Sequence, residues 1–319
     1  MTGSSAAVRP VVSIMGPTAS GKTGLAAELV QRFPFEIISV DSALVYRGMD
    51  IGTAKPDAET LRVAPHRLID FLDPSESYSA ARFRTDCLHE MEQIRSAGGL
   101  PLLVGGTMLY FRALQYGLSP LPGADPAIRR RLETQLRETG AAALHARLAQ
   151  IDPAAARRIH PNDPQRVQRA LEVYELSGRP MSAHFAEPDP GYTPVPLLKI
   201  ALLPRDRAAL HARIELRFDQ MLEAGLVAEV ERLYKRGDLR AQLPAMRAVG
   251  YRQVWQYLAG ELDHAEMRRR AVVATRQYAK RQMTWLRSEP GLIPLDADAP
   301  GLRDRVCALL EEHKVFDGL

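Results

Sequence analysis

The chain has 319 residues, of which 46% are hydrophobic and 25% are charged, a composition typical of a globular protein with a sizeable core. Its formal net charge is +4, which favours a polyanionic partner only weakly. No run approaches the ~18 apolar residues of a membrane span, and the first residues lack a signal-peptide stretch. We therefore expect a soluble, cytoplasmic protein with no membrane partner. Cys87 and Cys307 are too few for a disulfide framework and are expected to be reduced core thiols.

The first predicted elements are a buried strand at residues 11–15, a glycine-rich loop and a helix. The loop reads GPTASGKT and fits the pattern G-x-x-x-x-G-K-[ST], which turns successive backbone N–H groups toward a phosphate. In such loops the lysine bridges phosphates and the Ser/Thr hydroxyl binds Mg²⁺, here Lys22 and Thr23. The predicted phosphate-binding residues are Gly16, Pro17, Thr18, Ala19, Ser20, Gly21, Lys22 and Thr23.

Three further buried strands are predicted along the chain. Residues 35–40 form one, which ends at Asp41, and residues 100–104 form another, which stops at two glycines before a helix-like segment. Residues 196–203 form the last. Strands that alternate with helices predict a mostly parallel sheet with helices on both faces and ligands at the carboxyl ends of its strands. The predicted fold class is therefore α/β, with a P-loop NTPase-like core.

The character of the sequence changes after about residue 118. Strand-like runs vanish, arginines crowd the helical segments, and Pro/Gly-rich edges appear at 119–126 and 186–196. We predict an α-helical insertion lobe at 119–194 that binds RNA. The core is expected to comprise 9–118 and 195–319, where helical periodicity returns after the last strand.

The residues alone leave the chemistry open. Asp41 could organise Mg²⁺ in a small-molecule or nucleoside kinase that binds ATP on the phosphate loop. Its continuation at 41–56 is polar, aromatic and glycine-punctuated, which is typical of a loop that positions an acceptor. A third hypothesis is an RNA-binding NTPase without transfer chemistry.

Six segments, in order along the chain, resemble tRNA dimethylallyltransferases, the isopentenyl-tRNA transferase family. These segments are 16–23, 41–56, 102–114, 160–180, 247–258 and 276–287. The resemblance implies transfer of a dimethylallyl group from dimethylallyl diphosphate to the exocyclic N6 amine of the adenosine immediately 3′ of the anticodon, in tRNAs that read codons starting with U. The phosphate loop would then hold a leaving diphosphate.

The resemblance also implies roles for individual residues. Lys22 and Arg217 would contact the diphosphate, and Asp41 would accept the proton of the weakly basic adenine amine. Thr107 would touch the tRNA near the reacting base. From its position before a helix, Thr107 could also serve as a helix N-cap.

An adenosine must leave the anticodon-loop stack to reach such a site, which requires a second, basic surface. Of the 42 basic residues 36 are arginines, the better phosphate ligand, and Arg130 and Arg131 lie in the lobe. Tyr251 is expected to stack on a base. The residues implied to contact tRNA are Asp41, Ser42, Ala43, Leu44, Thr107, Arg129, Gln165, Arg166, Val167, Gln168, Arg169, Arg247, Ala248, Val249, Gly250, Tyr251 and Arg252.

Two features depart from the family pattern. Ala43 and Leu44 stand where many relatives have methionine and glutamine, so the side chain that reads the base is not assigned. The chain also lacks the cysteine and histidine pairs of relatives with a zinc finger. It therefore resembles the compact bacterial form, and we expect a monomer.

Overall fold

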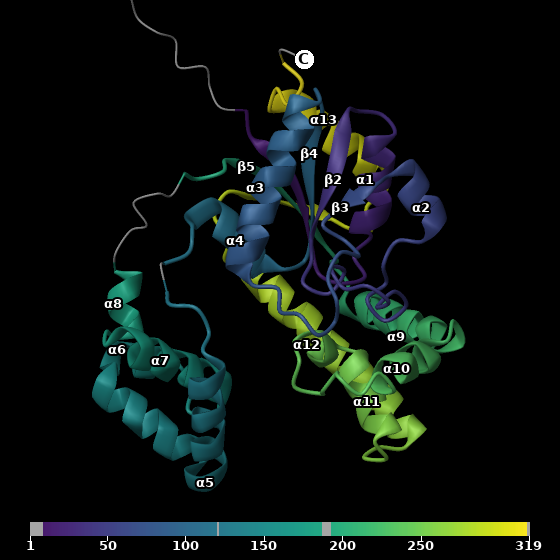
Figure 1. Cartoon of the computed structure of the whole chain (residues 1–319). Coiled ribbons are helices and arrows are strands. Elements are labelled where there is room, and N and C mark those ends of the chain that lie inside the picture. Colours follow the sequence, from purple (N-terminus) through teal and green to yellow (C-terminus); the bar gives the residue numbers. More distant parts are fainter. Residues whose placement is uncertain (1–8, 120, 187–192, 318–319) are drawn as a thin grey trace, which may run out of the picture. The chain divides into compact units, whose positions relative to one another are not determined.

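The computed structural model describes residues 9–119, 121–186 and 193–317. The chain divides into two compact units, Met1–Gln115 with Val195–Leu319 and Tyr116–Pro194 (Figure 1). The sequence predicts these boundaries after residues 118 and 194. Parts of the two Pro/Gly-rich edges, Pro120 and 187–192, lie outside the described residues.

A single parallel sheet forms the centre of the larger unit. Its strands are ordered β3-β2-β4-β1-β5-β6, and every paired neighbour runs parallel. The strands are β1 (Val11–Met15), β2 (Phe35–Val40), β3 (His66–Arg67), β4 (Leu100–Gly105), β5 (Leu197–Leu203) and β6 (Leu292–Asp296). Four of these confirm the predicted strands.

The two edge strands were not predicted. β3 has only two residues, too few for a periodic signal. β6 contains Pro294 and is only half-buried, as expected of an edge strand, where a missing N–H and a solvated face are tolerated. The sequence signal was strong only where both faces of a strand are covered.

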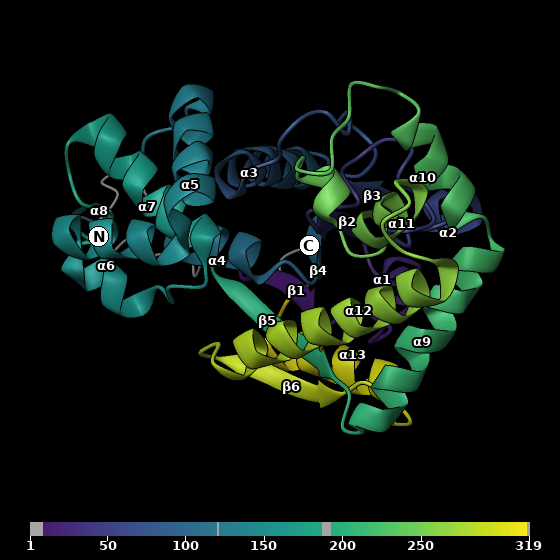
Figure 2. The same ribbon diagram turned by 90° about the horizontal axis from the view of Figure 1, so that it is seen from below.

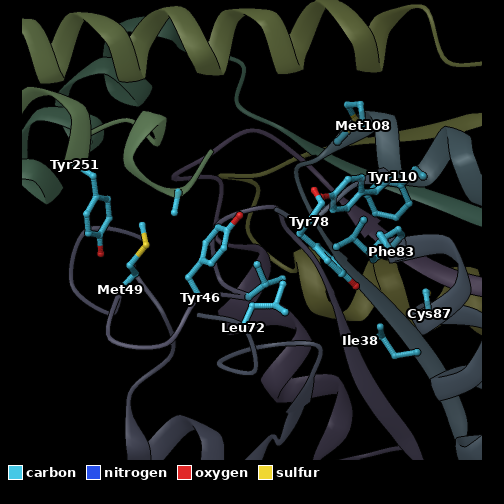
Figure 3. Close-up of a cluster of buried hydrophobic side chains, with 14 of the residues drawn as sticks. Ile38, Tyr46, Met49, Leu72, Tyr78, Phe83, Cys87, Met108, Tyr110 and Tyr251 are labelled. Atoms are coloured by element: carbon cyan, nitrogen blue, oxygen red, sulfur yellow. The ribbon is translucent and has the colours of Figure 1, made fainter. Parts of the chain in front are cut away.

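Helices cover both faces of the sheet, which confirms the predicted fold class. On one face, α1 (Lys22–Val30) and α13 (Leu302–Glu312) bury leucines against β1, β2 and β5. On the other, α3 (Ala80–Ser96) and α4 (Met108–Tyr116) pack an aromatic cluster against the sheet (Figures 1 and 3). The rings of Phe83 and Tyr110 stack there with centroids 4.3 Å apart. Cys87 is buried in this cluster and Cys307 is half-buried, and both are free thiols.

The helices that follow β5 complete the larger unit. The helical region that the sequence predicts after the last strand is divided by Gly225, which has a φ of 99°, into α9 (Arg207–Glu223) and α10 (Leu226–Tyr234). Figure 2 shows α9 and α11 (Tyr251–Leu258) beside the long helix α12 (His264–Arg287). The described part of this unit also contains α2 (Ala58–Val63) and the 3₁₀ turn η1 (Ala245–Arg247).

In the smaller unit, all regular structure among residues 116–119, 121–186 and 193–194 is helical, as predicted for the insertion lobe. Its helices are α5 (Pro126–Ile151), α6 (Pro153–Arg158), α7 (Pro164–Ser177) and α8 (Met181–Phe185). The first three begin with an aspartate N-cap and a proline in the first turn, because the cap satisfies free N–H groups and proline lacks one. Gly140, with a φ of 83°, kinks α5, and both halves of α5 contribute to a small apolar core shared with α6 and α7.

Candidate active site

The phosphate loop joins β1 to α1 at the carboxyl end of the sheet. Gly21 has a φ of 81°, a conformation that favours glycine. A Cβ on Gly16 would lie 2.6 Å from Ser20 Oγ and 2.8 Å from the carbonyl oxygen of Leu202. Both glycines of the motif are therefore required by the backbone of the loop. Thr23 is exposed in the first turn of α1, where its hydroxyl is accessible to a ligand.

Two cations lie close to this loop with their charges partly removed from water. Burial lowers the pKa of Lys22 to about 8, opposed by the charge of Asp41 and assisted by that of Arg217. Burial also lowers the pKa of Arg217. Lys22 Nζ donates to the carbonyl oxygen of Pro17 at 2.6 Å. Because desolvated cations gain most from an anionic partner, this site suits a phosphate group.

Asp41 follows β2 directly and forms a tight turn with its own loop. Its Oδ1 accepts from the backbone N–H groups of Ala43 at 2.8 Å and Leu44 at 3.3 Å, as aspartate does in Asx turns. Neither bond uses Oδ2. One carboxylate oxygen therefore fixes the loop while the other is available for a proton.

Thr107 is held beside the end of β2. Its N–H donates to the carbonyl oxygen of Val40, and a Cβ on Gly105 would lie only 2.1 Å from that oxygen. The hydroxyl Oγ1 is buried and makes no well-formed hydrogen bond among the described residues, although the Tyr278 hydroxyl is near enough to interact with it. The helix-cap interpretation is therefore wrong, since a cap would bond that oxygen to α4. A buried hydroxyl without a well-formed hydrogen bond, close to the end of the strand that leads into Asp41, suits contact with a substrate.

Tyr278 on α12 belongs to the same cluster. Burial raises the pKa of its hydroxyl and the negative charge of Asp41 raises it further, while Thr107 lowers it. The 276–287 segment had been noted as a family motif, but nothing in its spacing distinguished Tyr278 from other helix residues. Tyr278 belongs to this cluster because of the face that α12 turns toward the carboxyl ends of the strands, and the sequence alone does not specify that face.

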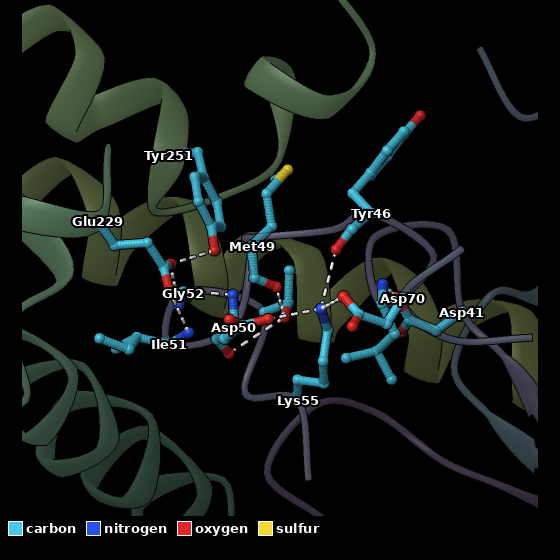
Figure 4. Close-up of polar contacts among 12 residues, drawn as sticks. Asp41, Tyr46, Met49, Asp50, Ile51, Gly52, Lys55, Asp70, Glu229 and Tyr251 are labelled. Carbon is cyan, nitrogen blue, oxygen red and sulfur yellow. Dashed lines mark hydrogen bonds and ion pairs between the residues drawn. The ribbon is translucent and has the colours of Figure 1, made fainter. Parts of the chain in front are cut away.

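A buried carboxylate anchors the loop that follows Asp41 (Figure 4). Glu229 on α10 is 1% exposed and accepts from the backbone N–H groups of Asp50 at 3.0 Å, Ile51 at 2.8 Å and Gly52 at 3.2 Å. It also accepts from the Tyr251 hydroxyl at 2.5 Å. A Cβ on Gly52 would lie 2.5 Å from the Tyr251 ring. Sequence reasoning missed Glu229, which reads as an ordinary helix residue.

Lys55 fixes the far end of the same loop (Figure 4). Its Nζ bonds the carbonyl oxygen of Tyr46 at 2.9 Å and the carboxylates of Asp50 and Asp70 at 2.5 and 2.6 Å. Its side chain is 6% exposed, so this cation belongs to the loop and not to the solvent. Together with Glu229 it gives the segment after Asp41 a defined conformation.

The segment at 247–252 corrects one prediction. Tyr251 is completely buried and its hydroxyl is bonded to Glu229, so the prediction that its ring stacks on a base is wrong. Arg247 and Arg252 are exposed on either side, while Ala248 and Val249 are half-buried and Gly250 is buried with a φ of 92°. The segment therefore presents its arginines and keeps its tyrosine inside.

The structure of the lobe contradicts a second prediction and shows that several of the predicted arginines form ion pairs. Val167 is 1% exposed in the core of the lobe, so contact of its side chain with tRNA is wrong. Arg129 and Arg169 both bond Glu172, at 2.9 and 2.6 Å, and Arg131 pairs with Glu175.

The other predicted contacts of the lobe lie at its surface. Arg166 is 70% exposed, 3.3 Å from Asp163. Arg130 and Gln165 are exposed and Gln168 is half-buried.

In the larger unit, Ser42 is exposed and Ala43 and Leu44 are half-buried. An open pocket on α12 is lined by Gln277, Lys280, Arg281, Thr284 and Trp285. The guanidinium of Arg112 lies 5.3 Å from the Trp285 ring centroid. Cations beside an exposed aromatic ring are typical of surfaces that bind single-stranded nucleic acid.

Within the ranges that the structure describes, no helix is both long and apolar enough to cross a bilayer. The same residues hold no group of three His, Cys, Asp or Glu side chains placed to bind a metal. The donor predicted for Mg²⁺ is a hydroxyl, that of Thr23, and it fits an ion that keeps several waters and binds substrate phosphates.

Comparison with known proteins agrees with this geometry. A family model described as IPP transferase matches residues 44–289. The chain belongs to the IPP transferase family. A tRNA dimethylallyltransferase of Thioalkalivibrio sulfidiphilus is 64% identical over 97% of this chain and 98% of its own length. One of Thiobacillus denitrificans is 60% identical over 95% and 97%.

Solved structures of the IPP transferase family share the fold. The full-length tRNA isopentenylpyrophosphate transferase of Bacillus halodurans is 39% identical with a TM-score of 0.68, covering 96% of this chain and 98% of that one. A eukaryotic dimethylallyltransferase described as acting on tRNA is 30% identical with a TM-score of 0.73, covering 91% and 74%. These relatives favour prenyl transfer over the kinase alternative.

Proposed function

We propose that the protein transfers a dimethylallyl group from dimethylallyl diphosphate to the N6 amine of the adenosine immediately 3′ of the anticodon, in tRNAs that read codons starting with U. It acts as a soluble monomer and releases diphosphate. The observation that carries the proposal is the convergence of two desolvated cations, Lys22 and Arg217, with the carboxylate of Asp41 at a phosphate loop. A transferase needs both an anion site and a proton acceptor.

The leaving group determines what the phosphate loop does. When the allylic C–O bond breaks, its electron pair remains on the diphosphate, so negative charge grows where the loop N–H groups, Lys22 and Arg217 lie. Mg²⁺ held by Thr23 and phosphate oxygens would neutralise part of this charge. A phosphate loop that assists cleavage of a P–O bond in a kinase would therefore assist cleavage of a C–O bond here.

The reaction also requires a group that accepts a proton from the adenine amine. The adenine amine is a weak base, so loss of its proton to a positioned carboxylate is worth ~10²–10⁴-fold. Asp41 Oδ2 suits this role because Oδ1 is engaged by the turn. The buried hydroxyl of Thr107 lies on the neighbouring strand end and can hold the base or its ribose in register.

The tRNA is the partner whose anticodon stem-loop carries the acceptor. Because the adenosine must be flipped to reach the strand ends, the protein must also hold the flanking nucleotides. The exposed candidates in the larger unit are Arg247, Arg252 and the pocket on α12 that includes Trp285. Those in the smaller unit are Arg166 and Gln165. We propose these as backbone and stacking contacts.

The test is a transfer assay with two labelled donors. The protein is incubated with an anticodon stem-loop RNA and either dimethylallyl diphosphate carrying label in the prenyl group or ATP labelled at the γ-phosphate. Prenyl label should enter the RNA, and a stem-loop with guanosine at the acceptor position should take none. Transfer of phosphate label with no prenyl label would overturn the proposal in favour of the kinase.

A further inference from the structure

We infer that Gln282 is a positioning residue that sets the spacing between the phosphate loop and the turn that carries Thr107. In the proposed reaction this spacing fixes the leaving diphosphate relative to the acceptor amine. The inference rests on the proposed function, and its test separates the two. Gln282 lies on α12, remote in sequence from both segments that it joins.

The geometry is specific. Gln282 is 5% exposed; its Oε1 accepts from the N–H of Thr18 in the phosphate loop at 2.9 Å, and its Nε2 donates to the carbonyl oxygen of Gly106 at 2.8 Å. The orientation of the amide is determined because the N–H can only donate and the carbonyl can only accept. A Cβ on Gly106 would lie 2.3 Å from Nε2 and 3.1 Å from the carbonyl oxygen of Gly16. The three segments are therefore in direct contact.

Few side chains can make this bridge. A carboxylate lacks the donor for Gly106, a lysine or arginine lacks the acceptor for Thr18, and asparagine is one methylene shorter. An apolar side chain would leave both the N–H of Thr18 and the carbonyl oxygen of Gly106 without this partner, which is unfavourable for groups shielded from water. Glutamine supplies one donor and one acceptor without charge, so it adds no repulsion beside a bound diphosphate.

The same face of α12 also reaches the acceptor side. Tyr278 lies one turn before Gln282, and the charge of Asp41 and the hydroxyl of Thr107 both act on it. Residues four apart share one face of a helix, so Gln282 bonds the phosphate loop and the Thr107 turn while Tyr278, one turn away, lies within electrostatic range of Asp41. A transfer reaction requires its reacting atoms ~3–3.5 Å apart, and a shift of about 1 Å can cost ~10²-fold.

The test compares Gln282→Met with Ser13→Ala. Ser13 is a matched control because it is also buried, and its Oγ donates to the carbonyl oxygen of Leu198 at 3.0 Å within the sheet. At saturating substrates, Gln282→Met should lower the single-turnover rate of prenyl transfer by about 10–100-fold. Its dissociation constants for dimethylallyl diphosphate and the stem-loop should stay within about threefold of wild type, and Ser13→Ala should keep the wild-type rate.

A second variant adds a signature that general destabilisation would not give. In Gln282→Glu, one oxygen still accepts from Thr18, but a carboxylate cannot donate to Gly106. A buried carboxyl group beside a carbonyl oxygen has a raised pKa and becomes a donor once protonated. Its transfer rate relative to wild type should therefore rise as the pH falls from about 8 to about 6, whereas Gln282→Met should show no such recovery.

The outcomes are distinct. Folded Gln282→Met that transfers prenyl groups as fast as Ser13→Ala overturns the positioning role, and a loss of tRNA affinity that matches the loss of rate assigns Gln282 to RNA contact instead. If the wild type itself transfers no prenyl group, the proposed function fails. Amide hydrogen exchange at Thr18 then still tests the bridge, because it should be faster in Gln282→Met, and unchanged exchange would refute it.

Discussion

The cations at the phosphate loop and the arginines of the Tyr116–Pro194 unit are used in opposite ways. Burial lowers the pKa of Lys22 and of Arg217. A bound anion would stabilise both cations, because the charge of Asp41 offsets the effect of burial on Lys22 only in part. In the smaller unit, burial by itself raises the pKa of Glu172, but hydrogen bonds from Arg129 and Arg169 hold it below its usual value. The cations at the phosphate loop are placed to bind a ligand, whereas the arginines of the smaller unit stabilise that unit through ion pairs.

This difference shows why a count of arginines overstates a binding surface. Several arginines of the smaller unit pair with carboxylates three residues away or across the α5–α7 contact. An ion pair between exposed side chains contributes ~0–1 kcal/mol to stability, but it also cancels the field that would attract RNA. The exposure of each guanidinium is therefore more informative than its presence, and the predictions below test both regions.

The largest effect is expected at Asp41. Asp41→Asn retains an oxygen for the turn to Ala43 and Leu44 and replaces Oδ2 by an amide that cannot accept a proton. Single-turnover prenylation of a stem-loop should fall by ~10²–10⁴-fold, with binding of both substrates nearly unchanged. The control is a Mg²⁺ titration: a rate restored by high Mg²⁺ would assign Asp41 to the metal and not to the proton.

A smaller effect is expected when a cation is removed from the phosphate loop. A charge-assisted hydrogen bond contributes about 1.5–3 kcal/mol, so Lys22→Met should weaken binding of dimethylallyl diphosphate by roughly 10–150-fold. Arg217→Ala should act in the same direction. Stem-loop affinity should be unchanged in both, and a parallel loss in a gel-shift assay would contradict the division between the two regions.

The pH dependence of Lys22 sharpens this prediction. With a pKa of about 8 in the free protein, Lys22 loses its proton as the pH rises through about 8, so the affinity for the diphosphate should fall above that pH. Lys22→Met should abolish this dependence. For the unliganded protein the sign is reversed, because the pKa of Lys22 in the folded state lies below its ordinary value of 10.5. The free energy of unfolding should therefore rise between about pH 8 and 10.5 as the buried charge is lost. Calorimetry without ligand measures this rise.

The sequence predicted the parts of the fold whose signals are local. The phosphate loop, four strands and the helical lobe follow from runs of buried residues, helical periodicity and glycine spacing. β3 and β6 were missed because an edge strand needs neither length nor continuous hydrophobicity. The division at Gly225 was likewise missed because the apolar period continues across it.

The site was predictable only where one motif carries the chemistry. Asp41 and Arg217 both act on the charge of Lys22, so the three residues lie near one another, while the roles that the family resemblance implies for them stay predictions. Glu229 and Gln282 were missed because each bonds backbone groups more than 170 positions away. Tyr251 was misassigned because its burial depends on Gly52, which leaves space for the ring. The spacing of residues within either segment does not predict this packing.

The buried tyrosine gives a prediction of intermediate size. Tyr251→Phe keeps the ring against Gly52 and removes the hydroxyl that Glu229 accepts, so it should lower the free energy of unfolding by about 1 kcal/mol. Stem-loop affinity should not change. Urea unfolding with a constant m-value measures the loss, and reduced RNA binding at undiminished stability would return Tyr251 to the binding surface.

The smallest effects separate two arginines of the lobe. Arg166 is 70% exposed beside Asp163, whereas Arg169 is 30% exposed and bonds both Glu172 and the carbonyl oxygen of Pro122. If Arg166 contacts the RNA backbone, Arg166→Ala should reduce the slope of log K against log salt by about one. Arg169→Ala should leave the slope unchanged and destabilise the lobe instead, because it removes a partner from a buried carboxylate. Arg303→Ala, at an exposed ion pair on α13, is the control. Equal slopes for Arg166→Ala and Arg303→Ala would place Arg166 among the arginines that only serve the lobe.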